Sequence, residues 1–227
     1  MIEEEWLASS DPTAMLEFLR GKASDRKLRL FACSCCRRIW SLIEGDRGRR
    51  AVEAAEEYAD QACSSDRLKR EWDAEGVMAV GHAIDGATAM NAEWGAGWAA
   101  RNVVEALTDR NLRNLRRPSS GDIRDWASAR LERKQSSDHA ERAIQATHLS
   151  DIFGNPFRPV TFNPSWRTLS VVRLAQTIYD ERSFGKIPDL GDALERSGCG
   201  DEAILNHCRE PGEHVRGCWV VDLVLGK

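Results

Sequence analysis

The chain has 227 residues, of which 42% are hydrophobic and 30% are charged, a balance that excludes a disordered polymer and allows a buried core. Its formal net charge of −4 gives no overall attraction to nucleic acid or to anionic membranes. It has no apolar run of about 18 residues, and its acidic start, MIEEEWLASS, lacks the order of a signal peptide. We therefore expect a cytoplasmic protein with no membrane partner, whose seven cysteines are reduced thiols or metal ligands.

Helix start and stop signals dominate the first two thirds of the chain. Ser10 or Asp11 before a proline predicts a helix that ends at Gly21, and Ser24 predicts a second helix that ends at Gly45. Apolar residues at spacings of three and four then predict a helix over residues 46–63. Further helices are expected over residues 65–85, 86–108 and about 120–152, the last as one helix or two.

The amino-acid composition changes at residues 153–166, which hold three of the seven prolines. This segment is predicted to be an extended connector that packs along the helical part of the protein. Short helices are expected after it, over residues 167–182, 188–197, 201–208 and 213–225. Strand signals are nearly absent, so we predict an all-α fold, an irregular helical bundle of about eight to ten helices. The predicted domains are an N-terminal helical domain (1–152), the connector (153–166) and a C-terminal helical subdomain (167–227) packed on the first.

The stretch LRLFACSCCRRIW places three cysteines within four positions of the second predicted helix. On a period of 3.6 residues, Cys35 and Cys36 fall on the apolar side, which predicts that they are core residues. Cys33 falls away from that side and is expected to be an exposed thiol. The C-x-x-C spacing of Cys33 and Cys36 does not favour redox catalysis, because it lacks a helix N-terminus to lower a thiol pKa. Arg37 and Arg38 are expected where this helix meets the surface or a partner.

The C-terminal stretch NHCREPGEHVRGCWVVDLVLGK carries the strongest candidate metal ligands, His207, Cys208, His214 and Cys218. His214 and Cys218 are four residues apart, so they share a face of the last predicted helix, and His207 or Cys208 would approach from the preceding one. Zinc takes four nitrogen or sulfur ligands in a tetrahedron. Cys36 is a further candidate, because the first and last helices of a bundle often meet. We nevertheless expect no cofactor, with Cys218 beside Trp219, Val220 and Val221 in the apolar core of the last helix, and zinc is the alternative.

A stripe of arginines precedes the long predicted helix. Arg110, Arg113, Arg116 and Arg117 recur at spacings that place most of them on one helical face, where they would hold phosphates of a nucleic acid. The alternative is a solvated helix end, which the interspersed acidic residues favour.

Acid–base candidates are fewer. Arg142 and His148, in the stretch RAIQATH, are loosely similar to the arginine–histidine pair of helical HEPN-type ribonucleases, but Ala143 stands where those sites have a polar residue. The sequence contains no glycine-rich phosphate loop, no nucleophile elbow and no H-E-x-x-H motif.

Three long blocks resemble the signature blocks of a large family of uncharacterised planctomycete proteins: DPTAMLEFLRGKASDRKLRLFACSCCRRIW, DIFGNPFRPV and HVRGCWVVDLVLGK. The resemblance covers the chain to about residue 60 and from about residue 148 onward. The resemblance implies no particular activity or catalytic residue. Members of the family are similar to modules found in multiple copies, and such modules suit roles in interaction or regulation.

From these features we expect a non-enzymatic interaction or regulatory module with a protein partner. The eight tryptophans favour this reading, because exposed aromatic residues are enriched in protein interfaces. The first alternative is a zinc-containing or nucleic-acid-binding helical protein. The second is a helical ribonuclease or toxin-like enzyme.

Overall fold

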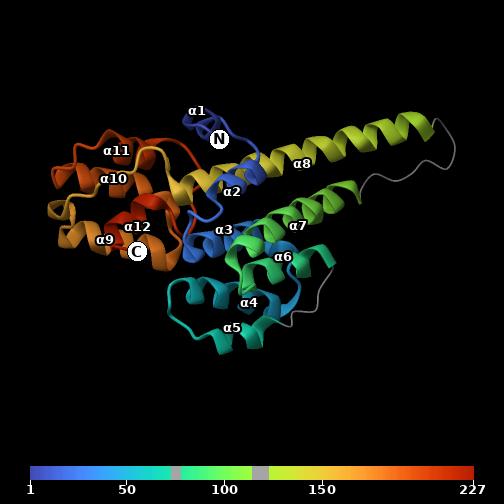
Figure 1. Ribbon diagram of the computed structural model, residues 1–227, viewed down its shortest axis with the longest axis horizontal. Helices are drawn as coiled ribbons and strands as arrows, with labels where there is room; N and C mark the ends of the chain where they lie inside the picture. Colours follow the sequence, from blue (N-terminus) through green and yellow to red (C-terminus); the bar gives the residue numbers. More distant parts are fainter. Residues whose placement is uncertain (73–77, 114–122) are drawn as a thin grey trace. The chain divides into compact units, whose positions relative to one another are not determined.

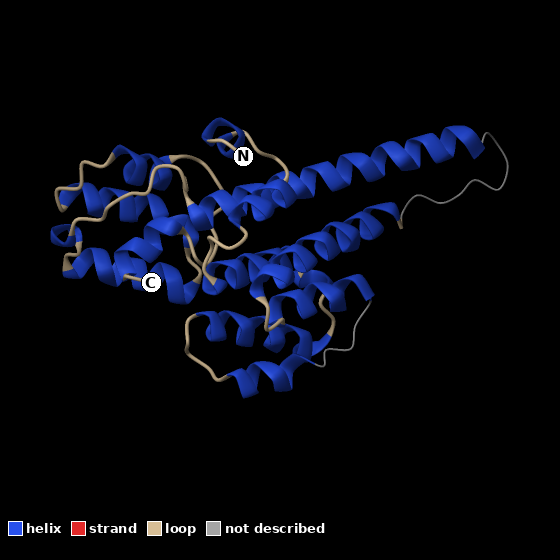
Figure 2. Cartoon of the chain, in the orientation of Figure 1, coloured by secondary structure: helices blue, strands red, loops and turns tan. Residues whose placement is uncertain are grey.

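The computed structural model describes residues 1–72, 78–113 and 123–227. Figure 2 shows helices joined by loops and no strand among these residues, which confirms the predicted all-α class. The described residues form twelve α-helices, more than the eight to ten expected. The chain divides into two units, Met1–Ala146 and Thr147–Lys227, so the division falls inside a helix and not at the proline-rich connector.

The N-terminal unit begins with short helices and ends with long ones (Figure 1). Its elements are α1 (Glu3–Leu7), α2 (Pro12–Leu19), α3 (Asp25–Arg38), a 3₁₀ turn (Trp40–Leu42), α4 (Gly45–Ala59), α5 (Ser65–Trp72), α6 (Met78–Thr88), α7 (Ala92–Leu112) and the part of α8 (Ile123–Phe153) that ends at Ala146.

Side-chain caps explain where several of these helices start. The Asp11 carboxylate accepts a hydrogen bond from the backbone N–H of Thr13 at 2.9 Å, and the Ser24 hydroxyl accepts one from Lys27 at 3.3 Å. Asn91 caps α7 in the same way through the N–H of Trp94. The predicted helix over residues 86–108 therefore starts later than expected, and that over 65–85 is two helices, α5 and α6.

Helix α3 is the centre of the N-terminal unit. It packs against α4, α6 and α7, and its residues from Leu28 to Cys36 are all buried. The prediction that Cys33 is exposed is therefore wrong: its exposed fraction is 1%, and its thiol faces the carbonyl of Val52 on α4. Because neighbours cover α3 on several sides, the polar side inferred from helical phase does not reach solvent.

The two arginines at the end of α3 form ion pairs within the unit. Arg37 makes a two-point contact with the buried carboxylate of Glu56 on α4, at 2.8 and 3.1 Å. Arg38 pairs at 3.1 Å with Glu141 on α8, which is also buried. Both arginines thus join α3 to neighbouring helices, and both are only partly exposed.

The C-terminal unit is built from short helices around its own core (Figure 1). After the end of α8 come a 3₁₀ turn (Pro164–Trp166), α9 (Leu169–Glu181), a 3₁₀ turn (Phe184–Lys186), α10 (Ile187–Arg196), α11 (Glu202–Arg209) and α12 (Trp219–Leu225). Val160, Phe162 and Trp166 of the connector pack against this core. No helix in the described parts of the chain is both long and apolar enough to cross a membrane.

Candidate metal centre

Four potential metal ligands of the C-terminal unit converge on one point. They are Asp151 in the last turn of α8, His207 on α11, His214 in the loop that follows, and Cys218, the N-cap residue of α12. Their ligand atoms all lie within 4.8 Å of one another. Asp151 and Cys218 are buried, and the two imidazoles are only partly exposed.

The individual distances are close to those of a tetrahedral ligand shell. The Nε2 atom of His207 lies 3.2 Å from both the Asp151 Oδ1 and the Cys218 Sγ atoms. The Nδ1 atom of His214 lies 2.6 Å from the same Oδ1 and 4.0 Å from the same Sγ. Zinc–ligand bonds of about 2.0–2.3 Å imply edges of about 3.3 Å between nitrogen or oxygen atoms and about 3.6 Å to sulfur. The edge from His207 to Asp151 lies within about 0.1 Å of its expected value, and the two edges to sulfur deviate by about 0.4 Å in opposite directions. The edge from His214 to Asp151, at 2.6 Å, is shorter than a ligand shell requires.

Asp151 fixes the loop that carries His214. Its Oδ2 atom accepts a hydrogen bond of 2.8 Å from the backbone N–H of Val215, so only its Oδ1 atom faces the imidazoles. Burial by itself would raise the pKa of Asp151, but the hydrogen bonds and charges of His207 and His214 outweigh burial and lower the pKa overall. The carboxylate is therefore held as an anion in a buried place.

The geometry does not suit a Cys–His–Asp catalytic triad. In a triad, the acid binds one ring nitrogen of the histidine and the nucleophile binds the other. Here Asp151 and Cys218 both face the Nε2 atom of His207, and both face the Nδ1 atom of His214. The Cys218 thiol is also fully buried, and burial raises its pKa well above the usual value, with Asp151 adding to the effect. Such a thiol is a poor nucleophile unless a cation stabilises its thiolate.

The surroundings of the centre hold its side chains in place. The ring of Trp219 packs against the ring of His207, with the centroids 5.0 Å apart. Trp219 also lies against Gly154, where an added Cβ would come within 3.2 Å of the indole. Gly154 also has a φ of +64°, so this position requires glycine for both its conformation and its space.

The structure brings together three of the four predicted C-terminal ligands and leaves out Cys208. Cys208 is in the core instead, where its side chain packs so closely on Gly191 of α10 that an added Cβ there would lie 2.7 Å from the Cys208 Cβ. The reason given for pairing His214 with Cys218 is wrong, because α12 starts at Trp219 and these residues share no helical face. The backbone of the preceding loop brings them together instead.

Asp151 was missed by the sequence analysis. It stands in the block DIFGNPFRPV, 63 positions before His214. The signal was an acidic side chain between Leu149 and Ile152, both of which are buried. An acid on the apolar part of a helix needs a partner, and that requirement could have singled it out.

The remaining predicted site residues lie elsewhere. Cys36 belongs to the N-terminal unit, where its buried thiol donates to the carbonyl of Ala83 at 3.2 Å. Arg110 and Arg113 line a cavity of about 100 Å³ together with Glu44 and Asp109, so acidic side chains offset their charge. The other two arginines of the stripe, Arg116 and Arg117, lie outside the described residues.

The residues of the ribonuclease-like pair have other neighbours. Arg142 forms an ion pair with Asp11 at 3.3 Å in the N-terminal unit. His148 is buried in the C-terminal unit, with Glu213 at 3.7 Å from its Nε2 atom. Comparison of the chain with models of protein families, with curated proteins and with solved structures finds no match.

Proposed function

We propose that this chain is a zinc-containing helical protein, in which Asp151, His207, His214 and Cys218 hold a structural Zn²⁺ ion. The observation that carries the proposal is the convergence of four ligand atoms of suitable type, two of them from buried residues, on one point. Zinc accepts carboxylate, imidazole and thiolate ligands and is nearly always four-coordinate in structural sites. Because protein atoms would fill all four positions, the site would stabilise the fold and have no place for a substrate.

A hydrogen-bond network without metal explains the same contacts less well. The Nε2 atom of His207 faces an acidic oxygen and a thiol at equal distances of 3.2 Å. If this nitrogen carries the proton, it donates a hydrogen bond to the carboxylate. It then has no lone pair with which to accept a hydrogen bond from the thiol. If it lacks the proton, it accepts from the thiol and its lone pair faces the carboxylate. A cation at the common point satisfies all three groups at once, and its charge favours the thiolate of Cys218.

Metal content tests the proposal directly. We expect about one zinc per chain, by elemental analysis, in protein purified without chelator. The substitutions His207→Ala, His214→Ala and Cys218→Ser should each remove most of it. His139→Ala and Cys63→Ser are matched controls, because both residues lie outside the cluster and neither is buried. Wild-type protein that contains no zinc and takes up none when it is added would overturn the proposal.

Cobalt substitution separates this site from adventitious surface binding. Co²⁺ in a tetrahedral site with a thiolate ligand gives visible d–d absorption together with sulfur-to-cobalt charge transfer. We expect both signals in the cobalt-loaded wild type, and we expect Cys218→Ser to lose the charge-transfer band. The spectrum of octahedral Co²⁺ in the wild type would contradict the proposed ligand set.

A protein-interaction role, in the cytoplasm and without catalysis, stays a second proposal. Trp94 on α7 favours it, because 52% of this residue is exposed while its ring stacks on that of Trp98 at 5.2 Å. An exposed tryptophan stacked on a partly exposed one is typical of residues that dominate interfaces. A partner captured by the wild type should be lost with Trp94→Ser and kept with Leu131→Ser, a control at a residue that is 54% exposed on α8. Equal capture by both variants would argue against this surface.

A further inference from the structure

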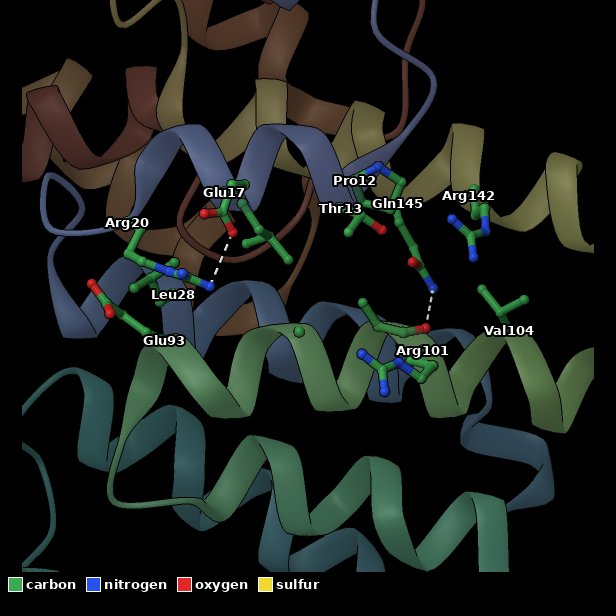
Figure 3. Close-up of a pocket in the computed structure, with 13 residues that line it drawn as sticks. Pro12, Thr13, Glu17, Arg20, Leu28, Glu93, Arg101, Val104, Arg142 and Gln145 are labelled. Atoms are coloured by element: carbon green, nitrogen blue, oxygen red, sulfur yellow. Dashed lines mark hydrogen bonds and ion pairs between the residues drawn. The ribbon is translucent and has the colours of Figure 1, made fainter. Parts of the chain in front are cut away.

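The N-terminal unit contains a cavity of about 190 Å³ bordered by α2, α7 and the part of α8 that belongs to this unit. Figure 3 shows side chains from these helices around it, together with Leu28 of α3. Pro12, Leu16, Leu28 and Val104 give it apolar walls. The volume is below the range of about 300–1,000 Å³ for drug-sized ligands, so its occupant would be a small molecule.

Gly97 leaves this cavity open on the side of α7. A Cβ built at this residue meets no atom within 4 Å, although Gly97 is one of the residues that line the cavity. Neither a close helix contact nor a positive φ requires glycine here. Glycine in a helix interior is unfavourable by about 1 kcal/mol relative to alanine. The space that it leaves therefore has no structural explanation in its immediate surroundings.

Gln145 provides a buried polar group in the wall of the cavity. Its side chain is fully buried and reaches from α8 to α7, where its Nε2 atom donates to the carbonyl of Ala100 at 3.0 Å (Figure 3). Its Oε1 atom is buried and accepts no hydrogen bond from any described residue. A buried acceptor without a donor is unfavourable by about 1–3 kcal/mol. A ligand that donates a hydrogen bond would remove this penalty.

Arg101 provides a positive charge at the same cavity. It lines the cavity from α7, is exposed, and forms no ion pair with any other described residue. The other charged groups in the lining are occupied. Arg20 pairs with Glu17 at 3.0 Å, and Glu93 accepts a hydrogen bond of 2.7 Å from the backbone of Gly21. Arg142 on α8, which also lines the cavity, pairs with Asp11 at 3.3 Å.

We propose that this cavity binds a small organic anion with an apolar body and a hydrogen-bond donor, for example a hydroxy acid. The carboxylate would pair with Arg101, the body would lie against the apolar walls, and the donor would meet the Oε1 atom of Gln145. A guanidinium binds carboxylates through two parallel hydrogen bonds, which gives directional selectivity for that group. The inference rests only on residues of the N-terminal unit and is independent of zinc.

The probe for this proposal is 4-hydroxybenzoate, titrated into full-length ¹⁵N-labelled protein and followed by NMR chemical shifts. Benzoate lacks the donor, and 4-hydroxybenzamide lacks the charge, so each removes one of the proposed contacts. We expect saturable shifts at residues of the cavity, and binding at least about tenfold weaker for each analogue, because an unmade buried hydrogen bond or charge contact has this effect.

Two variants test the location. Arg101→Gln should weaken binding of 4-hydroxybenzoate about tenfold or more and should leave the binding of 4-hydroxybenzamide nearly unchanged. Arg110→Gln, also exposed on α7 but outside this cavity, is the matched control. Gly97→Leu should abolish binding by filling the space, while the spectrum of the unliganded protein shows that the fold is kept. Wild-type protein that shows no saturable shifts with 4-hydroxybenzoate, or Arg101→Gln and Gly97→Leu variants that bind it as the wild type does, would overturn the proposal.

Discussion

Zinc is expected to raise the thermal stability of the C-terminal unit by a measurable amount. An ion that binds the folded state alone and is present at 100 times its dissociation constant adds about 2.7 kcal/mol to the free energy of unfolding. The unit has 81 residues, from Thr147 to Lys227. For a domain of this size the added stability raises the midpoint of unfolding by about 11–22 °C. The shift in the midpoint is large because the entropy of unfolding of so small a unit is small.

Calorimetry with zinc and with a chelator measures the midpoint, and hydrogen exchange locates the change. We expect zinc to slow exchange in α11, in the following loop and in α12, because these segments carry three of the four ligands. Exchange in α3 of the N-terminal unit should not change. His214→Ala should remove the zinc-dependent rise in the midpoint, and His139→Ala should retain it.

One outcome is incompatible with a structural zinc ion. If the wild type unfolds at the same midpoint with zinc and with the chelator, and exchange in α11 and α12 is unchanged, then no ion holds these segments together. The four side chains would then form a hydrogen-bond network only. Asp151→Asn would in that case still destabilise the protein, because the two imidazoles would lose the buried anionic acceptor that they share.

Three further predictions concern packing, thiol reactivity and pH. Gly191→Ala should lower the free energy of unfolding by about 1–3 kcal/mol in urea denaturation, because the new Cβ meets the Cβ of Cys208. Cys208→Gly removes that Cβ and should relieve the loss. Cys208→Ala keeps the Cβ, so equal relief by this substitution would contradict the assigned contact. A bulky thiol reagent should modify Cys63 first, because the other six cysteines are buried. Mass spectrometry of labelled peptides measures the order of modification, and equal labelling rates would disagree with this burial. Burial alone would raise the pKa of Asp138, but hydrogen bonds from neighbours on α7 and α8 lower this pKa overall. The contribution of Asp138 to stability is therefore present above the unfolded pKa of about 3.9 and is lost as the pH falls through the folded pKa. The acid-induced loss of stability should therefore be smaller in Asp138→Asn than in the wild type, and acid titrations of unfolding that coincide would contradict the shift.

Local signals were sufficient to predict most helices but not what surrounds them. Asp11 and Ser24 act as caps because their side chains contact residues two or three positions away, and such contacts depend only on the nearby sequence. The burial of Cys33 depends on α4, which crosses α3 after an intervening turn. Helical phase describes one helix by itself and so cannot show how many of its sides are covered.

The candidate metal centre was predicted in part, and for a partly wrong reason. The residue types of His207, His214 and Cys218 were sufficient to mark the right stretch of chain. Their arrangement depends on the loop before α12, and that loop is held by a hydrogen bond from the backbone of Val215 to Asp151. Because Asp151 is distant in sequence, no local pattern could connect it with the other three ligands.

The position of the four ligands along the chain explains why a metal ion suits this unit. Asp151 lies near its start and Cys218 near its end, so one ion would cross-link almost the whole unit. A cross-link that closes a loop of this length removes conformational entropy from the unfolded chain, worth roughly 4 kcal/mol on the scale established for disulfides. The ligands also meet at the ends of α8 and α11 and at the start of α12, where helices leave backbone groups without partners. The ion would therefore tie these helix ends to one another at the edge of the core to which Cys218 belongs.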